Sequence, residues 1–103
     1  MQPFQPDEVS KQLTQWLHRQ IYIHLEVNPG AYWRNGTGVL HAVYVKGEGP
    51  WRIFLQLDDA AGLIQIDDLT HMSLQAHVVV CIGFDDRQRL ARTIEISRTP
   101  FPI

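Results

Sequence analysis

The chain has 103 residues, a size that supports one hydrophobic core, and we expect a single domain over residues 1–103. Hydrophobic residues make up 45% of the sequence, enough for a packed core, which excludes a disordered chain. The formal net charge of -2 excludes the basic surface that binds phosphate backbones or anionic membranes. We therefore expect neither nucleic acid nor a membrane as a partner.

The sequence also indicates a cellular compartment. Cys81 is the single cysteine and cannot form an internal disulfide, and the N-terminal residues lack the basic and apolar segments of a secretion signal. No apolar run approaches the roughly 20 residues that cross a bilayer. We therefore expect a cytoplasmic protein.

One segment near the N-terminus has helical periodicity. The apolar residues Val9, Leu13, Trp16 and Leu17 recur at helical spacing, and polar residues fill the opposite face. Pro6 suits the first helical position, and acidic residues follow it. The pattern predicts an amphipathic helix over 6–18.

The first half of the remaining chain predicts three strands. Residues 21–27 alternate between apolar and polar side chains up to a turn that contains Pro29 and Gly30. Residues 37–45 are apolar on both faces, which is typical of a central strand covered on both sides. Residues 51–57 follow a Gly-rich turn, and we expect them to form a hairpin with 37–45.

The second half predicts three further strands and an extended tail. A short strand over 63–67 places Ile64 and Ile66 on one side. A long alternating run over 72–82 predicts one strand, of a length that usually bends or bulges in a small domain. The last strand covers 90–97, with Leu90, Ile94 and Ile96 inward, and two prolines keep residues 99–103 extended.

These elements define the expected fold class. Short strands joined by Gly and Asp turns, after one helix, are typical of a mainly β fold. We expect a small antiparallel barrel or half-barrel with one N-terminal amphipathic helix. A parallel βαβ arrangement is excluded because the sequence has no second helix for a crossover.

The strand over 21–27 carries the main candidate site. Tyr22, His24 and Glu26 are two residues apart and share one face, with about 6.5–7 Å between successive Cα atoms. Imidazole and carboxylate groups could begin a metal or acid–base site, completed by another histidine. The candidates for that histidine are His41, His71 and His77. The alternative is that these residues form only the polar, hydrogen-bonded face of a half-buried strand.

Other reactive residue types favour a structural role. Cys81 lies between two apolar residues with no basic neighbour, which is typical of a buried, unreactive thiol. The sequence has no HExxH or CxxC motif and no nucleophile elbow, so we assign no catalytic residue and no metal ligand.

Four segments carry a resemblance to a known family. Together they cover most of the chain, and the most specific are the strand around His24 and the hairpin before Arg52. The segments are IYIHLE (21–26), PGAY (29–32), GEGPWR (47–52) and ISRTPF (96–101). They resemble the YojF-like family, small proteins of Bacillus and related Firmicutes. The resemblance implies an all-β, barrel-like fold with an N-terminal helix and no established activity, and it adds Trp51 and Arg52 as ligand-binding candidates.

The family context also implies a partner. Members are often encoded beside a deacetylase of bacillithiol biosynthesis, so the resemblance implies a role near that enzyme by neighbourhood alone. The leading hypothesis is a non-enzymatic binding or accessory module, with that deacetylase as a possible partner. The alternative is a small enzyme or metal-binding protein that uses Tyr22, His24 and Glu26. A third possibility is a homo-oligomer that pairs through an exposed strand edge.

Overall fold

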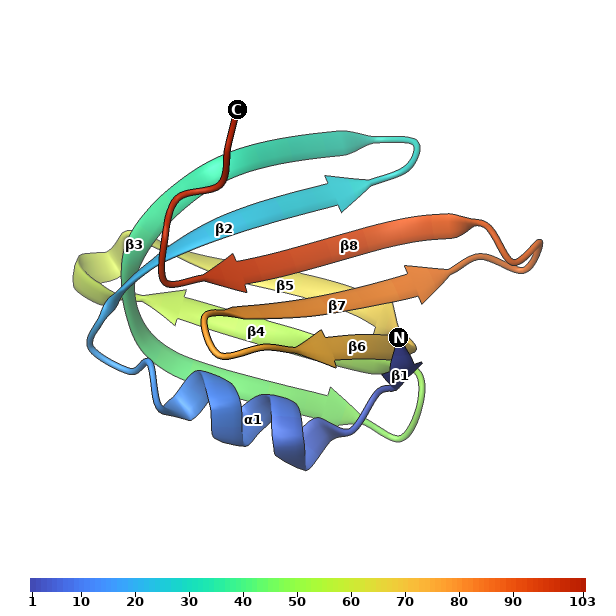
Figure 1. Ribbon diagram of the computed structural model, residues 1–103, viewed down its shortest axis with the longest axis horizontal. Coiled ribbons are helices and arrows are strands. Elements are labelled where there is room, and N and C mark those ends of the chain that lie inside the picture. The colour runs from blue at the N-terminus through green and yellow to red at the C-terminus, as the bar shows by residue number, and fades with distance from the viewer.

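The computed structural model describes residues 1–103 as one eight-stranded antiparallel sheet with a single α-helix (Figure 1). The order of strands across the sheet is β1-β6-β7-β8-β2-β3-β4-β5. The elements are β1 (Gln2–Pro3), α1 (Pro6–Thr14), β2 (Gln20–Val27), β3 (Ala31–Gly47), β4 (Trp51–Leu57), a 3₁₀ turn (Asp58–Ala60), β5 (Gly62–Leu69), β6 (His71–Leu74), β7 (Val78–Phe84) and β8 (Leu90–Ser97). This confirms the mainly β class with one N-terminal helix. No helix of the chain is long and apolar enough to cross a membrane.

The sheet folds back on itself along β3, which in Figure 1 curves from the upper part of the molecule around to its lower part. The first part of β3 pairs with β2, and its second part pairs with β4. We call β1, β6, β7, β8, β2 and the first part of β3 the large half-sheet. The second part of β3 with β4 and β5 is the small half-sheet. The core lies between them and contains Ile21, Ile23, Leu40, Leu55 and Ile96, all fully buried.

Of the two expected forms, barrel and half-barrel, the closed barrel is wrong, because the two edge strands β1 and β5 do not pair with each other. On one side the end of β5 instead packs against β7, where Gly83 leaves room for the carbonyl oxygen of Asp68. On the other side α1 covers the gap between β3 and β7 (Figure 1). A helix and a tight strand contact thus complete the core where hydrogen bonds would have closed a barrel.

The helix α1 presents the predicted apolar stripe to the core. Val9 and Leu13 are fully buried and Trp16 nearly so. The predicted C-terminal boundary is wrong, since the helix ends at Thr14 and continues as a tighter turn in which Trp16 N–H donates to the Leu13 carbonyl. His18 adopts a positive φ of 65°, which no α-helix continues.

The strand β3 is longer than the predicted 37–45 and contains two bulges. Gly36 and Trp33 pair with Ile23 and Leu25, so three steps along β3 face two along β2. The second bulge lies near His41, where the pairing with β4 also shifts. It moves the inward positions from even numbers, as at Leu40, to odd numbers, as at Val43. This explains why both faces of the segment are apolar in sequence although Tyr44 is exposed.

The predicted long strand over 72–82 is wrong, because the segment folds into the hairpin of β6 and β7. Met72 pairs with Cys81 and Leu74 with Val79, around a turn closed by a hydrogen bond from Gln75 N–H to the Val78 carbonyl. The turn reverses which face each number occupies, so Met72 and Cys81 both reach the core. The alternation of apolar and polar residues continues through the turn, so the sequence does not reveal this change of face.

Three further predictions concern the remaining strands. The hairpin of β3 with β4 is confirmed. Within β5, Ile64 and Ile66 share one side as predicted, and that side faces the core, although the strand runs from Gly62 to Leu69. The bounds of β8 are as predicted and Ile94 and Ile96 are buried, but Leu90 is exposed, so its predicted inward position is wrong. The register with β7 shifts near Phe84, which pairs with Leu90.

Candidate ligand-binding site on the outer face

The predicted face of β2 lies on the outside of the large half-sheet. Ile21 and Ile23 enter the core, so Tyr22, His24 and Glu26 lie on the opposite surface, which we call the outer face. Of these three, His24 is 5% exposed although it lies on the outer face. A cover over this part of the sheet must therefore exclude water from the imidazole.

The C-terminal residues form that cover. Phe101 N–H donates to Asn35 Oδ1 at 2.8 Å, and Asn35 Nδ2 donates to the Phe101 carbonyl at 2.8 Å. Arg34 Nε donates to the Pro102 carbonyl at 2.8 Å. The Phe101 ring packs against both the Arg34 guanidinium and the His24 imidazole, with 5.1 Å from Arg34 Cζ to the ring centroid. In Figure 1 this tail, in red, passes from the end of β8 toward β3.

The first bulge of β3 positions the residues that bind the tail. Asn35 has a φ of 57°, a left-handed conformation that Asn adopts more readily than most residues. The extra residue there turns Arg34 onto the outer face beside His24. The run Arg34-Asn35-Gly36, which interrupts the apolar alternation, is the sequence signal that could have predicted this bulge.

Hydrogen bonds determine which tautomer His24 adopts. Arg34 Nη1 lies 3.1 Å from His24 Nδ1, and a guanidinium can only donate, so Nδ1 accepts. The ring proton is then on Nε2, which lies 3.3 Å from Glu26 Oε1. Glu26 is also held through Oε2, which accepts a 2.8 Å hydrogen bond from Asn28 Nδ2. The result is a continuous chain from Arg34 through His24 and Glu26 to Asn28.

A hollow of about 480 Å³ opens on the outer face beside this chain. We call it the outer-face hollow. Its apolar residues on the strands are Val80, Ile82 and Leu90, from β7 and β8. The other lining residues are Met1, His24, Glu26, Ser73, Gln75, Thr93 and Glu95. Four strands of the large half-sheet thus contribute, and strand pairing brings their side chains together.

Two polar side chains that β8 contributes to the hollow have no partner within the chain. Thr93 is only 9% exposed, yet its hydroxyl makes no hydrogen bond. Every fully buried polar side-chain atom in the structure is satisfied, so the Thr93 oxygen must be accessible from the hollow. Glu95 lies opposite His24 in the register and has no ion pair. Neither residue was predicted from the sequence, because only the pairing of β2 with β8 brings them beside His24.

The histidines proposed as further metal ligands do not join His24. His41 interacts with Asp58, with 3.1 Å between Nδ1 and Oδ1, on the other side of the β3 bend. His71 pairs with the Thr70 hydroxyl at 2.8 Å, and His77 lies in the turn between β6 and β7. No group of three or more His, Cys, Asp or Glu side chains in the chain is arranged to hold a metal ion.

The other two predicted ligand-binding residues lie away from the hollow. Trp51 stacks on Phe4 with 6.1 Å between ring centroids, at the end of the hairpin of β3 with β4. Arg52 is half-exposed and forms a long ion pair with Asp67, with 3.9 Å from Nε to Oδ1. Neither residue lines the outer-face hollow. The two parts of the predicted site therefore belong to different regions of the molecule.

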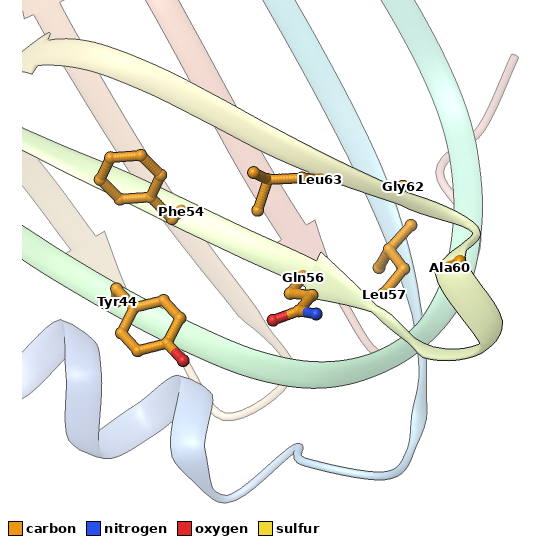
Figure 2. A pocket seen from close by; sticks show the side chains of 7 residues that line it. All are labelled: Tyr44, Phe54, Gln56, Leu57, Ala60, Gly62 and Leu63. Atoms are coloured by element: carbon orange, nitrogen blue, oxygen red, sulfur yellow. The ribbon is translucent and has the colours of Figure 1, made fainter.

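A second hollow, of about 500 Å³, lies on the outside of the small half-sheet (Figure 2). The aromatic rings of Tyr44 and Phe54 and the side chain of Leu63 lie along neighbouring strands there. Its lining contains no charged residue. The outer-face hollow is the stronger candidate for specific recognition, because it combines apolar surface with oriented charged and polar groups.

Comparison with known proteins agrees with this architecture. Residues 3–101 match the model of the family described as "Protein of unknown function (DUF1806)". The chain belongs to this family. It is 28% identical over 112 residues to the "Uncharacterized protein YojF" of Bacillus subtilis (strain 168), covering 94% of this chain and 95% of that protein. This confirms the resemblance found in the sequence.

A solved structure shows the same fold. The crystal structure of the Bacillus subtilis YojF protein superimposes with a TM-score of 0.87 and 28% sequence identity. The match covers 99% of this chain and 97% of that one. The fold described for this chain is therefore shared with the Bacillus subtilis protein.

Proposed function

We propose that this DUF1806 protein is a non-enzymatic binding module and that the outer-face hollow is its ligand site. The observation that carries the proposal is the engagement of both His24 ring nitrogens. Arg34 occupies Nδ1 and Glu26 faces Nε2, so the imidazole has no free nitrogen for a reacting proton. The imidazole therefore cannot also activate the hydroxyl of Ser73 or Thr93, which line the same hollow. The arrangement orients polar groups, which suits recognition.

An NMR screen of small polar metabolites against the uniformly ¹⁵N-labelled protein tests this proposal. We expect amide shift changes that cluster on the outer positions of β2, β7 and β8. The variant Val80→Arg, which places a long side chain in the hollow, should lose these changes. The matched variant Leu63→Arg, in the hollow of Figure 2, should keep them. Shift changes that are lost in Leu63→Arg and kept in Val80→Arg would contradict the proposed location.

The alternative of a small enzyme or metal-binding protein makes a different prediction. Elemental analysis of protein purified without a histidine tag from metal-rich medium should show no stoichiometric metal. A ligand found in the screen should return unchanged after prolonged incubation with the protein. Stoichiometric metal, or conversion of the ligand, would favour the alternative.

Two partners of this protein are predicted, a deacetylase of bacillithiol biosynthesis and a second copy of the chain. Co-purification with the neighbouring bacillithiol-biosynthesis deacetylase, or a change in its rate on addition of this protein, would support the accessory role. For a homo-oligomer, β5 is the edge strand with enough length to pair with a second copy. Sedimentation at several concentrations tests that pairing, and the variant Gln65→Pro, within β5, should abolish any self-association that it detects.

A further inference from the structure

Resting on the proposed function, we infer that the outer-face hollow binds a small organic cation whose ammonium group lies between Glu26 and Glu95. Its apolar part would cover Val80 and Ile82. The charge of the hollow, the register of β2 with β8 and the apolar lining each support this ligand class.

The charge of the hollow favours a cation. Glu26 and Glu95 are its two carboxylates, no lysine or arginine side chain lines it, and the terminal ammonium of Met1, another lining residue, forms no ion pair with either carboxylate. Arg34, the nearest cation to His24, is engaged by the Pro102 carbonyl and by the imidazole. Two carboxylates facing one partly desolvated space repel each other, and a cation between them replaces that repulsion with attraction.

The register of β2 and β8 places the two carboxylates near each other. His24 pairs with Glu95 and Glu26 pairs with Thr93, so the two glutamates are diagonal neighbours on the same face. Diagonal neighbours in an antiparallel pair lie about 7–8 Å apart, within reach of long side chains. The two carboxylates can therefore approach one ammonium group, which has three hydrogens to donate.

The polar groups of the hollow are either held in position or without a partner, so they are available to a ligand. The contacts of Glu26 with His24 and Asn28 hold its carboxylate in place. Glu95 has no ion pair, and Thr93 is nine-tenths buried while its hydroxyl has no hydrogen-bond partner. A buried hydroxyl that opens into a hollow lacks a partner unless water or a ligand supplies one. An ammonium or hydroxyl group of the ligand would supply it.

The lining of the hollow favours an organic cation over a metal ion. Divalent cations such as Ca²⁺ take six or more oxygen ligands, and the chain has no suitable group of even three acidic or imidazole side chains. Val80, Ile82 and Leu90 instead offer apolar surface beside the carboxylates. Apolar surface next to charge matches a molecule with an ammonium head and a carbon body.

A matched pair of probes tests the inference. 1,4-Diaminobutane carries two ammonium groups, and 1,4-butanediol has the same carbon chain without charge. NMR titration should show binding of the diamine at the outer positions of β2, β7 and β8, weakened by added NaCl, and at least about tenfold weaker binding of the diol.

Variants separate this inference from the proposed function. Glu95→Gln keeps the shape of the side chain and should weaken diamine binding by about tenfold, whereas Glu48→Gln, in the exposed turn before β4, should not change it. Circular dichroism confirms that each variant is folded. Equal binding of diol and diamine, no binding of the diamine, or wild-type binding by Glu95→Gln would overturn the inference. If a neutral metabolite still binds and Val80→Arg blocks it, the proposed function stands without the inference. Binding of Ca²⁺ that displaces the diamine would also overturn it.

Discussion

His24 illustrates how a single side chain depends on its neighbours. Its position on β2 follows from local alternation, and so does its proximity to Glu26. Its burial and its tautomer instead depend on Arg34 and on Phe101, which arrive from β3 and from the C-terminal tail. The face of the candidate site was therefore predictable from sequence, whereas its chemistry depends on contacts between distant segments.

Cys81 gives a prediction at the scale of one residue. Burial raises the pKa of its thiol to about 12, so the reactive thiolate is scarce in the folded protein. We expect a maleimide to leave the native protein unmodified at pH 7 and to label it fully in denaturant. Labelling should stay slow up to about pH 9, because the thiolate remains a minor form below the pKa.

Cys81 is the only cysteine, so mass spectrometry reports on this site alone. Rapid labelling of the native protein would show that the interior between the half-sheets opens readily.

At the scale of elements, the bulge in β3 links the sheet to the tail. Asn35 combines a left-handed backbone with two hydrogen bonds to Phe101. We expect Asn35→Gly to destabilise the fold by about 1–3 kcal/mol, since glycine tolerates the backbone but loses both side-chain bonds. Asn35→Ala should cost about 1–2 kcal/mol more, because alanine also opposes the positive φ.

Urea denaturation of both variants measures the difference. Equal stabilities for the glycine and alanine variants would show that the backbone at this position relaxes out of the left-handed conformation.

The turn between β7 and β8 gives a prediction of pH dependence. The Arg89 backbone N–H lowers the pKa of Asp85, with further help from the Arg87 N–H and the Arg89 guanidinium. A carboxyl whose pKa is lower when folded stabilises the turn above its unfolded pKa of about 4. That stabilisation is lost as the pH falls through the lower, folded pKa. We expect the amide protons of Arg87 and Arg89 to lose protection only in that acid range.

The variant Asp85→Asn is the control, because its side-chain oxygen still accepts hydrogen bonds but does not titrate there. Amide exchange of Arg89 that still changes with acid pH in Asp85→Asn would assign the effect to another group.

Elements also show where sequence patterns mislead. Residues 72–82 alternate without a break because Gln75, Ala76 and His77 continue the polar and apolar order through a tight turn. No Gly or Pro marks that turn, so periodicity alone predicts one strand. The second bulge of β3 has the opposite effect, since it makes a strand with one exposed face appear apolar on both.

At the scale of the whole molecule, α1 completes the core that the open sheet leaves uncovered. Trp16 follows the helix and belongs to the main cluster of buried residues. We expect Trp16→Ala to destabilise the protein by about 3–5 kcal/mol, the usual cost of removing a large buried side chain. Chemical denaturation measures it, with the exposed Gln15→Ala as control. A loss below about 1 kcal/mol would show that the helix contributes little to the closure of the core.

The order of strands across the sheet has a consequence for how the chain folds during synthesis. The hairpins β2–β3, β3–β4 and β4–β5 join neighbours along the chain and can form early. The other edge of β2 pairs with β8, so the pairing of Tyr22 with Ser97 forms only after β8 has been synthesised. Closing a loop of that length is slow, because its entropy is lost before its contacts form. Until the ribosome releases β8, β2 therefore exposes an unpaired edge, and a chaperone or a second nascent chain has its best access to the protein there.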